Sequence, residues 1–504
     1  MIMSAFVHLP LGTPIPNHPH AVSCSLPTMA AVRGYEEKDP AVTSRLATGY
    51  PRFVVHPFAR RLAAHVASRP EFAGRMLWLV SSARMARDLA SHLRPLPGAA
   101  ASPFEEDGLH GVSHAGSPET AARAKLYLQH LGGFISSREA EDRLAALGLV
   151  PSVQPEELYR GDAAAEIRRH LRRTFPAVTD ADLLLANSGM NAIYAAFRAV
   201  SDVQAERGRT VWVQLGWLYL DTIAVLKKFT SSPGDYVYAP DVMDAGALER
   251  LFAERGARIA GVVAEVPTNP LIQTADVAAL VGLCRRHGAK LILDPSVASA
   301  SSVYCLPHAD LVTASLTKYT GSEGDVIAGV VAVNPAAADA GELRRRTAAA
   351  LEPVYARDLA RLAVQIGGTD AVLARIEETT PRVAAFLSSH PRVRDVFWAL
   401  QPASRANFLR IARTPGSVGG MISFTLKTPM EPVYDRLRLP KGPSFGMKTT
   451  IICPFMYLAH YDLVTTAAGR AELAASGLDP DLLRLCVGTE PAEEIIGALA
   501  EALG

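Results

Sequence analysis

Between about residue 182 and residue 333 the chain alternates short apolar runs with helical stretches, and this rhythm constrains the fold more than any other feature. The runs are rich in β-branched residues and lie at 183–186, 211–215, 259–264, 290–293, 310–314 and 326–333. Strands that alternate with helices form a mainly parallel sheet with helices on both faces. In such sheets the chemistry gathers at the carboxyl ends of the strands. We therefore expect an α/β fold with a functional site at that edge.

The chain divides into four regions, since 504 residues exceed one ordinary domain. Residues 1–60 carry prolines throughout and are expected to form an extended arm without a long helix. Residues 61–180 are expected to be mainly helical, with a short strand at 76–80 and a loop at 95–117. Residues 181–377 form the large sheet domain, and residues 378–504 a smaller α+β domain with a strand at 421–426 and a closing helix at 492–503.

Charge and cysteine content exclude several classes of function. The net charge is +1 and no basic block is present, which argues against nucleic acid and anionic membrane as partners. The apolar runs are too short to span a bilayer. The first 32 residues contain no Lys, Arg, Asp or Glu, unlike a secretory or transit segment. Five scattered cysteines without CxxC spacing predict no metal site. A cytoplasmic protein is expected.

Lys318 lies between two hydroxyl residues, Thr317 and Tyr319, just after one apolar run, and Ser315 precedes it by three residues. Lysine is seldom buried without a partner or a chemical role. An amine held among apolar walls loses proton affinity and can form a Schiff base with an aldehyde. The alternative is a surface lysine whose stem covers apolar neighbours while its amine stays in water.

Two other strand ends carry residues that suit a phosphorylated, cationic ligand. Gly189 and Met190 follow a strand and open a helix, where backbone N–H groups bind phosphate, although such junctions are common. Asp294 ends the run at 290–293, and a buried carboxylate there needs a cationic partner such as a protonated pyridine nitrogen. The alternative for Asp294 is an ordinary cap or turn.

Three further segments supply polar or aromatic groups. Asn269 follows the strand at 259–264 within the sequence Glu-Val-Pro-Thr-Asn-Pro. Tyr219 begins a helix and either stacks on a planar cofactor or packs in the core. Tyr50 and Arg52 lie two residues apart in the arm, where they form a phosphate grip if extended and an ordinary turn otherwise.

Taken together, these motifs resemble the cystathionine γ-synthase-like family, the pyridoxal-phosphate (PLP) enzymes of cysteine and methionine metabolism. The resemblance covers about residues 40–504. The arm further resembles the long-chain, fungal-type cystathionine γ-synthases. The matching segments are Ser-Gly-Met at 188–190, Glu-x-Pro-x-Asn-Pro at 265–270, Asp294, Ser-x-Thr-Lys-Tyr at 315–319, Gly-Met-Ile-Ser-Phe at 420–424, Ser-Phe-Gly at 444–446 and Leu-Arg-Leu-x-Val-Gly at 483–488.

The resemblance implies a fold type I PLP-dependent transferase and a role for each matching residue. Lys318 would hold the cofactor and move substrate protons, and Tyr219 would stack on the ring as a second catalytic residue. Arg484 would bind the substrate carboxylate, helped by Ser444 and Asn269. The cofactor would be held by Lys318, Asp294, Gly189, Met190, Ser315, Thr317, Tyr219, Asn269, Tyr50 and Arg52.

In the resembled family the Tyr-x-Arg pair reaches the neighbouring subunit, which implies at least a homodimer, with a homotetramer expected. The implied activity is γ-replacement on an O-acylated homoserine with cysteine or another thiol, a reaction of methionine biosynthesis. The alternatives are a lyase that splits cystathionine or another thioether, γ-replacement by an unusual nucleophile, and a non-catalytic family member. The chain departs from the family at 220–221, 322–325 and 449–455, near the expected substrate.

Overall fold

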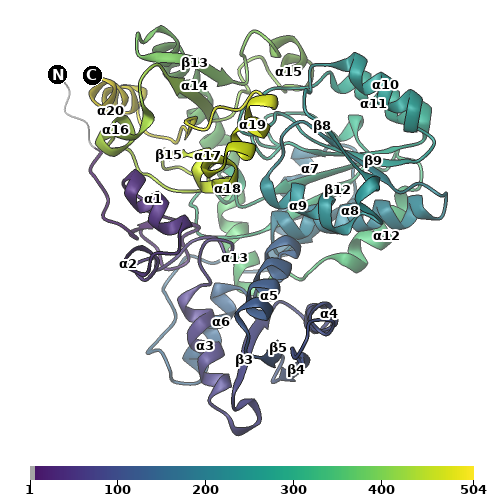
Figure 1. Cartoon of the computed structure of the whole chain (residues 1–504), viewed down its shortest axis with the longest axis vertical. Helices are drawn as coiled ribbons and strands as arrows, with labels where there is room; N and C mark the ends of the chain where they lie inside the picture. Colours follow the sequence, from purple (N-terminus) through teal and green to yellow (C-terminus); the bar gives the residue numbers. More distant parts are fainter. Residues whose placement is uncertain (1–5) are drawn as a thin grey trace.

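The computed structural model describes residues 6–504 and is built around a seven-stranded sheet (Figure 1). Its strand order is β6-β12-β11-β10-β9-β7-β8, and the pairs from β11 to β8 are parallel while β12 runs antiparallel to both neighbours. The strands are β6 (Leu183–Ala186), β7 (Val211–Leu215), β8 (Tyr236–Ala239), β9 (Ile259–Glu265), β10 (Lys290–Asp294), β11 (Leu311–Ser315) and β12 (Gly329–Val333). The mainly parallel sheet is confirmed.

Both faces of this sheet are covered, because successive side chains of a strand point to opposite sides. Ile292 of β10 packs into one hydrophobic core with Phe197, whereas Leu291 and Leu293 pack into a second core with Leu280. Within residues 6–504, no helix combines the length and the apolar character needed to cross a bilayer. The covering helices are α7 (Ala163–Thr174), α8 (Gly189–Ala205), α9 (Leu220–Phe229), α10 (Ala245–Arg255), α11 (Val277–His287), α12 (Ala340–Ala350) and α13 (Ala356–Ile366).

The carboxyl-terminal part is a smaller α+β unit, as expected. Its antiparallel sheet has the order β13-β14-β16-β15, and the predicted strand and closing helix are found at β14 and α20. The long helix α14 (Thr369–Ser389) leads into it. The other elements are β13 (Val393–Trp398), α15 (Arg405–Ile411), β14 (Met421–Leu426), α16 (Met430–Arg436), β15 (Ile451–Pro454), α17 (Phe455–Ala459), α18 (Tyr461–Thr465), α19 (Ala467–Ala475), β16 (Leu483–Cys486) and α20 (Ala492–Leu503).

A lobe at the bottom of Figure 1 holds a three-stranded antiparallel sheet, order β3-β5-β4, and four helices. The prediction of a loop over 95–117 is wrong, because β4 and β5 form a hairpin there. Its turn is Asp107-Gly108, with φ of 46° and 70°, and Asp-Gly at positive φ matches the twist of paired strands. The elements are α3 (Pro57–Ala67), β3 (Arg75–Val80), α4 (Ala83–Leu93), β4 (Ser102–Glu106), β5 (Leu109–Ala115), α5 (Pro118–Leu131) and α6 (Ser137–Ala146).

The amino-terminal arm lies against the carboxyl-terminal unit of its own chain, as the purple and yellow-green segments of Figure 1 show. Tyr434 donates a hydrogen bond to Leu26 O (2.8 Å), and Lys441 donates to Pro27 O (2.7 Å). The arm pairs β1 (Pro14–Ile15) with β2 (Ser23–Cys24) and contains the short helices α1 (Met29–Glu36) and α2 (Pro40–Thr43). Thr28 caps α1 through Ala31 N, so the arm is less extended than its prolines predict.

Candidate active site

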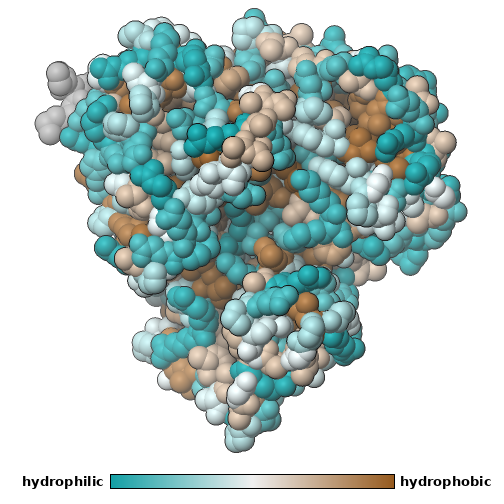
Figure 2. Space-filling view, viewed as in Figure 1, coloured by the Kyte–Doolittle hydropathy of each residue, from teal (hydrophilic) through white to brown (hydrophobic). Residues whose placement is uncertain are grey.

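A cavity of about 710 Å³ opens at the carboxyl ends of β9, β10 and β11, where the arm, the lobe and both sheets meet. Figure 2 shows this face hollowed between the lobe and the rest of the molecule, with hydrophobic residues in the hollow. All of the residues predicted for the site line this cavity: Tyr50, Arg52, Gly189, Met190, Tyr219, Asn269, Asp294, Ser315, Thr317, Lys318, Ser444 and Arg484.

Lys318 follows β11 and points its amine into the cavity while the side chain is otherwise enclosed. Its Nζ donates to Ser444 Oγ (3.0 Å) and contacts the Tyr50 hydroxyl, and the Phe445 ring lies 4.7 Å from it. Burial, with the charge of Arg484 nearby, lowers the pKa of Lys318 far below its ordinary value. The lowered pKa favours the neutral amine, which is the form that attacks an aldehyde and accepts protons.

Two carboxylates end the neighbouring strands β9 and β10, that of Glu265 buried and that of Asp294 half-buried. Burial raises the pKa of Asp294 to about 6, and burial together with Asp294 raises the pKa of Glu265 well above its ordinary value. Glu265 Oε1 accepts from Tyr219 N (2.6 Å), but its Oε2 has no hydrogen-bond partner in the described chain. Buried carboxylates without a cation fit a positively charged guest, and the protonated ring nitrogen of PLP has that charge.

The amino-terminal end of α8 forms a narrow cradle against the loop that carries Lys318, which is called the lysine loop below. Ser188 caps α8 through Asn191 N (3.1 Å), and a Cβ added to Gly189 would lie 2.9 Å from Ser315 Cβ. This close approach puts the first residue of α8 beside Ser315, and the N–H groups at the amino-terminal end of a helix suit a phosphate. Thr317 contributes differently, because its hydroxyl donates to Ala328 O (3.3 Å) and accepts from Ala328 N (3.1 Å). Thr317 thus braces the lysine loop.

Arg484 lies on β16 at the opposite wall and has no carboxylate within ion-pair distance in residues 6–504. It donates to Asn269 Oδ1 (3.3 Å) and to Ser444 O (3.1 Å), and its guanidinium lies 4.6 Å from the Phe455 ring. Ser444 is held at a φ of 86°, an uncommon conformation for a residue other than glycine. A buried guanidinium without an anion fits the carboxylate of an amino acid.

The arm places its two site residues in the cavity of its own chain, and their contribution to a neighbouring subunit stays a prediction. Tyr50 N donates to Val22 O (3.1 Å), which places the ring beside Lys318. Arg52 donates to Leu458 O (2.9 Å) near the carboxyl-terminal end of α17. The physical reason is that the preceding arm packs on the carboxyl-terminal unit of the same chain and directs both side chains inward.

Two buried residues of the site were not predicted. The sequence prediction includes Glu265 only as part of the motif Glu-Val-Pro-Thr-Asn-Pro and assigns it no role. A glutamate at the end of an apolar strand is nevertheless a signal of a buried carboxylate. Asp221 lies in the first turn of α9, two residues after Tyr219. In the sequence it stands out only as one of the positions where the chain departs from the family pattern. Its Oδ1 accepts from Gln129 Nε2 (2.6 Å), and this contact could not be inferred from sequence.

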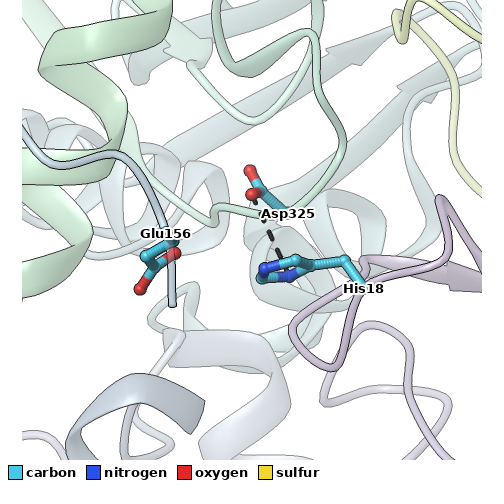
Figure 3. A group of neighbouring side chains, drawn as sticks. All are labelled: His18, Glu156 and Asp325. Atoms are coloured by element: carbon cyan, nitrogen blue, oxygen red, sulfur yellow. Dashed lines mark ion pairs between the residues drawn. The ribbon is translucent and has the colours of Figure 1, made fainter. Parts of the chain in front are cut away.

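His18, Glu156 and Asp325 bring possible metal-ligand atoms within 4.8 Å of one another (Figure 3). Arginines already bind both carboxylates: Arg138 Nη2 lies 2.7 Å from Glu156, and Arg361 Nε lies 2.8 Å from Asp325. We interpret the group as part of an ion-pair network that joins the arm, α6 and α13.

Comparison with known proteins agrees with this geometry. The model of the family "Cys/Met metabolism PLP-dependent enzyme" matches residues 166–504. An L-2-amino-4-chloropent-4-enoate dechlorinase/desaturase of Streptantibioticus cattleyicolor is 39% identical over 97% of both chains. A cystathionine gamma-synthase of Neurospora crassa is 26% identical over 98% of both. The fold is shared with cystathionine gamma synthase of Xanthomonas oryzae (TM-score 0.57, 23% identity, 73% of this chain and 96% of that one).

Proposed function

The chain belongs to the Cys/Met metabolism PLP-dependent enzymes, and we propose that its substrate is an α-amino acid with a leaving group on the γ-carbon. Relatives and solved structures similar to this chain include cystathionine gamma-synthases and a cystathionine gamma-lyase of Lactobacillus plantarum. Lys318 supports the proposal, because its buried amine lines the cavity and its pKa lies well below the ordinary value, which favours the form that accepts a proton. Bound PLP supplies an electron sink that acidifies the protons next to the amino-acid nitrogen.

The other steps, which are binding of the cofactor and substrate and transfer of protons, are assigned to individual residues of the cavity. Asp294 and Glu265 would face the ring nitrogen, and Gly189 with Ser315 would hold the phosphate. Arg484 would bind the substrate carboxylate and orient the chain of the substrate toward Lys318. Lys318 then takes a proton from the carbon that faces it and can return a proton after the leaving group has departed.

We propose that the reaction is an elimination, in which the leaving group departs and no nucleophile takes its place. The observation that carries this choice is the 39% identity over 97% of both chains with a protein named as a dechlorinase and desaturase. Loss of chloride together with a proton adds one unsaturation without a second reactant. Two aromatic rings, those of Phe445 and Phe455, flank Arg484 and suit a small apolar substituent such as a chloroalkene.

A second candidate is γ-replacement on an O-acylated homoserine with cysteine or another thiol. It is supported by the full-length match to a fungal cystathionine gamma-synthase. Arg60 of α3 in the lobe also lines the cavity, to which the arm contributes Arg52. These guanidinium groups could receive the carboxylate of an acyl group or of cysteine.

One set of incubations distinguishes these candidates. The protein is loaded with PLP and offered 2-amino-4-chloropent-4-enoate, or O-acetyl-, O-succinyl- or O-phosphohomoserine, each with and without cysteine. Chloride release independent of cysteine, with a product lighter by HCl, is the expected result. A thioether formed only when cysteine is present would establish replacement instead. Loss of both activities in Lys318→Ala, which keeps the rest of the cavity, controls for reactions that free PLP catalyses in solution.

A further inference from the structure

Tyr319 directly follows Lys318 but has no role in the proposed chemistry. The residue is 1% exposed and its φ is 34°, a conformation that is uncommon for a residue other than glycine. Its hydroxyl donates to Val297 O (3.0 Å) and accepts from Gly420 N (3.1 Å). Burial raises the pKa of Tyr319 well above its ordinary value, so the hydroxyl keeps the proton that it donates. The phenol is therefore bound to the backbone on both sides.

The two backbone groups that the phenol contacts belong to different parts of the molecule. Val297 lies in the turn that follows β10 of the large sheet. Gly420 directly precedes β14 of the carboxyl-terminal unit, and its carbonyl oxygen accepts from Val487 N (2.8 Å) just after β16. The hydroxyl of Tyr319 thus joins a strand end of the large sheet to the smaller sheet that carries Arg484.

The backbone of Tyr319 makes a second link toward Arg484. Tyr319 N donates to Gly446 O (2.6 Å), and Gly446 N donates to Cys486 Sγ (3.1 Å). A Cβ added to Gly446 would lie 2.7 Å from Tyr319 N, so the two segments touch through their backbones. Cys486 follows Arg484 by two residues on β16. The position of Arg484 is therefore tied through its own strand to the residue after Lys318.

Ser444 lies between the two groups that would bind the substrate. Its Oγ accepts from Lys318 Nζ (3.0 Å), and its carbonyl oxygen accepts from Arg484 (3.1 Å). We infer that Tyr319 is a positioning residue, which acts through β14, β16 and residues 444–446 to hold Arg484 at the distance from Lys318 that suits an α-amino acid. Ligands with a carboxylate next to the amine are favoured as a result. That role rests on the proposed α-amino-acid substrate, whereas the hydrogen bonds of Tyr319 do not.

The test compares two ligands that differ only in the carboxylate. L-2-Aminobutyrate has a γ-carbon without a leaving group, and propylamine is the same molecule without its carboxylate. Both are titrated into PLP-loaded protein and followed through the absorbance of the bound cofactor. In Tyr319→Phe we expect the affinity for L-2-aminobutyrate to fall about tenfold, the factor that corresponds to one buried hydrogen bond. The affinities for propylamine and for PLP should equal those of the parent protein.

Tyr238→Phe is the matched control for that substitution. Tyr238 of β8 donates to Ser476 Oγ (3.1 Å) and also joins the large sheet to the carboxyl-terminal unit, but it is not one of the described residues that line the cavity. It should leave both affinities unchanged. Cys486→Ala removes the acceptor of Gly446 N and should also weaken the binding of L-2-aminobutyrate. This second variant tests the link even if Tyr319→Phe does not fold.

An unchanged preference for L-2-aminobutyrate over propylamine in Tyr319→Phe would overturn the role of Tyr319, even if the melting temperature falls. An equal loss for both ligands, or the same loss in Tyr238→Phe, would overturn it as well. Arg484→Gln tests the proposed function separately. If Arg484→Gln keeps the preference, the carboxylate site of the proposed function is wrong. If Arg484→Gln loses the preference and Tyr319→Phe keeps it, only the role of Tyr319 is wrong.

Discussion

At the scale of single residues, the site gathers ionisable groups that have no opposite charge within ion-pair distance in residues 6–504. Asp294 and Glu265 lack a cation there, Arg484 lacks an anion, and burial lowers the pKa of Lys318 well below its ordinary value. Each of these states costs free energy in the empty protein. They are complementary to a bound group with a cationic ring and to a substrate with a carboxylate, so the binding of both relieves the cost.

For Asp294, this cost can be measured as the pH dependence of the free energy of unfolding. Its folded-state pKa of about 6 lies above the ordinary value of 3.8, so the native state binds the extra proton. The cofactor-free protein should therefore lose on the order of 2 kcal/mol of stability as pH rises from 4 to 7. In Asp294→Asn this contribution should vanish, so that the variant unfolds at a higher temperature than the parent at pH 7.5 while binding PLP more weakly.

Thermal unfolding of cofactor-free protein at pH 5 and pH 7.5 measures this effect. Asp241→Asn, a change at an exposed turn, is the control for an altered net charge. Equal temperature shifts in the two variants would show that the raised pKa of Asp294 does not affect stability.

At the scale of elements, the phosphate cradle depends on how closely α8 approaches the lysine loop. Gly189→Ala would place a Cβ 2.9 Å from Ser315 Cβ, and both atoms belong to backbone-anchored groups that cannot turn away. We expect the affinity for PLP to fall about tenfold, since overpacking costs about 1–3 kcal/mol. The affinity for pyridoxal, which lacks the phosphate, should fall less. Absorbance titrations with both compounds measure this difference.

Gly341→Ala is the matched control for that substitution. Gly341 also lies in the first turn of a helix, α12, and an added Cβ meets nothing within 4 Å. Its affinity for PLP should equal that of the parent protein. A Gly189→Ala variant that binds both compounds as the parent does would argue against the cradle as the phosphate site.

Arg138 of α6 joins three elements by ion pairs inside the protein. It is 1% exposed and contacts Glu156 (2.7 Å) and Asp358 of α13 (2.9 Å), and it donates to Asp325 O (2.7 Å) after the lysine loop. Arg138→Met should cost about 3–5 kcal/mol, because it leaves the buried carboxylate of Asp358 without a cation, although Glu156 keeps Arg357. Arg173→Met, whose partner Asp370 is 71% exposed, should cost less than about 1 kcal/mol.

Thermal unfolding of these two variants tests whether the network holds the lobe to the sheet. A melting temperature of Arg138→Met close to that of Arg173→Met would show that the carboxylates are protonated or solvated in the variant. A lower temperature together with weaker PLP binding would link the network to the lysine loop.

At the scale of the whole molecule, one chain brings all of the predicted site residues to one cavity. A mixture of Lys318→Ala and Arg52→Ala chains, unfolded and refolded together, should therefore recover no activity, because each chain lacks one of its own site residues. The double variant mixed with the parent protein is the control for refolding. Recovery of activity would show that the arm crosses to a neighbouring subunit in solution. Light scattering of the same samples tests the expected homodimer or homotetramer.

The sequence by itself determined the types of the elements and the chemistry at their ends. Period and length identify β9, β10 and β11, and short motifs place Asn269, Asp294 and Lys318 where those strands finish, because both signals are local. The Asp-Gly pair of the hairpin in the lobe is an equally local signal. The prediction of a loop over 95–117 overlooks this signal.

Only the tertiary structure decided which distant segments meet. Tyr50 reaches Lys318 of the same chain, Asp221 of α9 meets Gln129 of α5, and Arg138 joins Glu156 to Asp358. Each contact depends on how whole elements pack, and a side chain carries no local signal of a partner that lies many residues away. The burial that shifts the pKa values of Lys318 and Asp294 arises from the same packing, so the sequence supplied the groups and the fold set their charge.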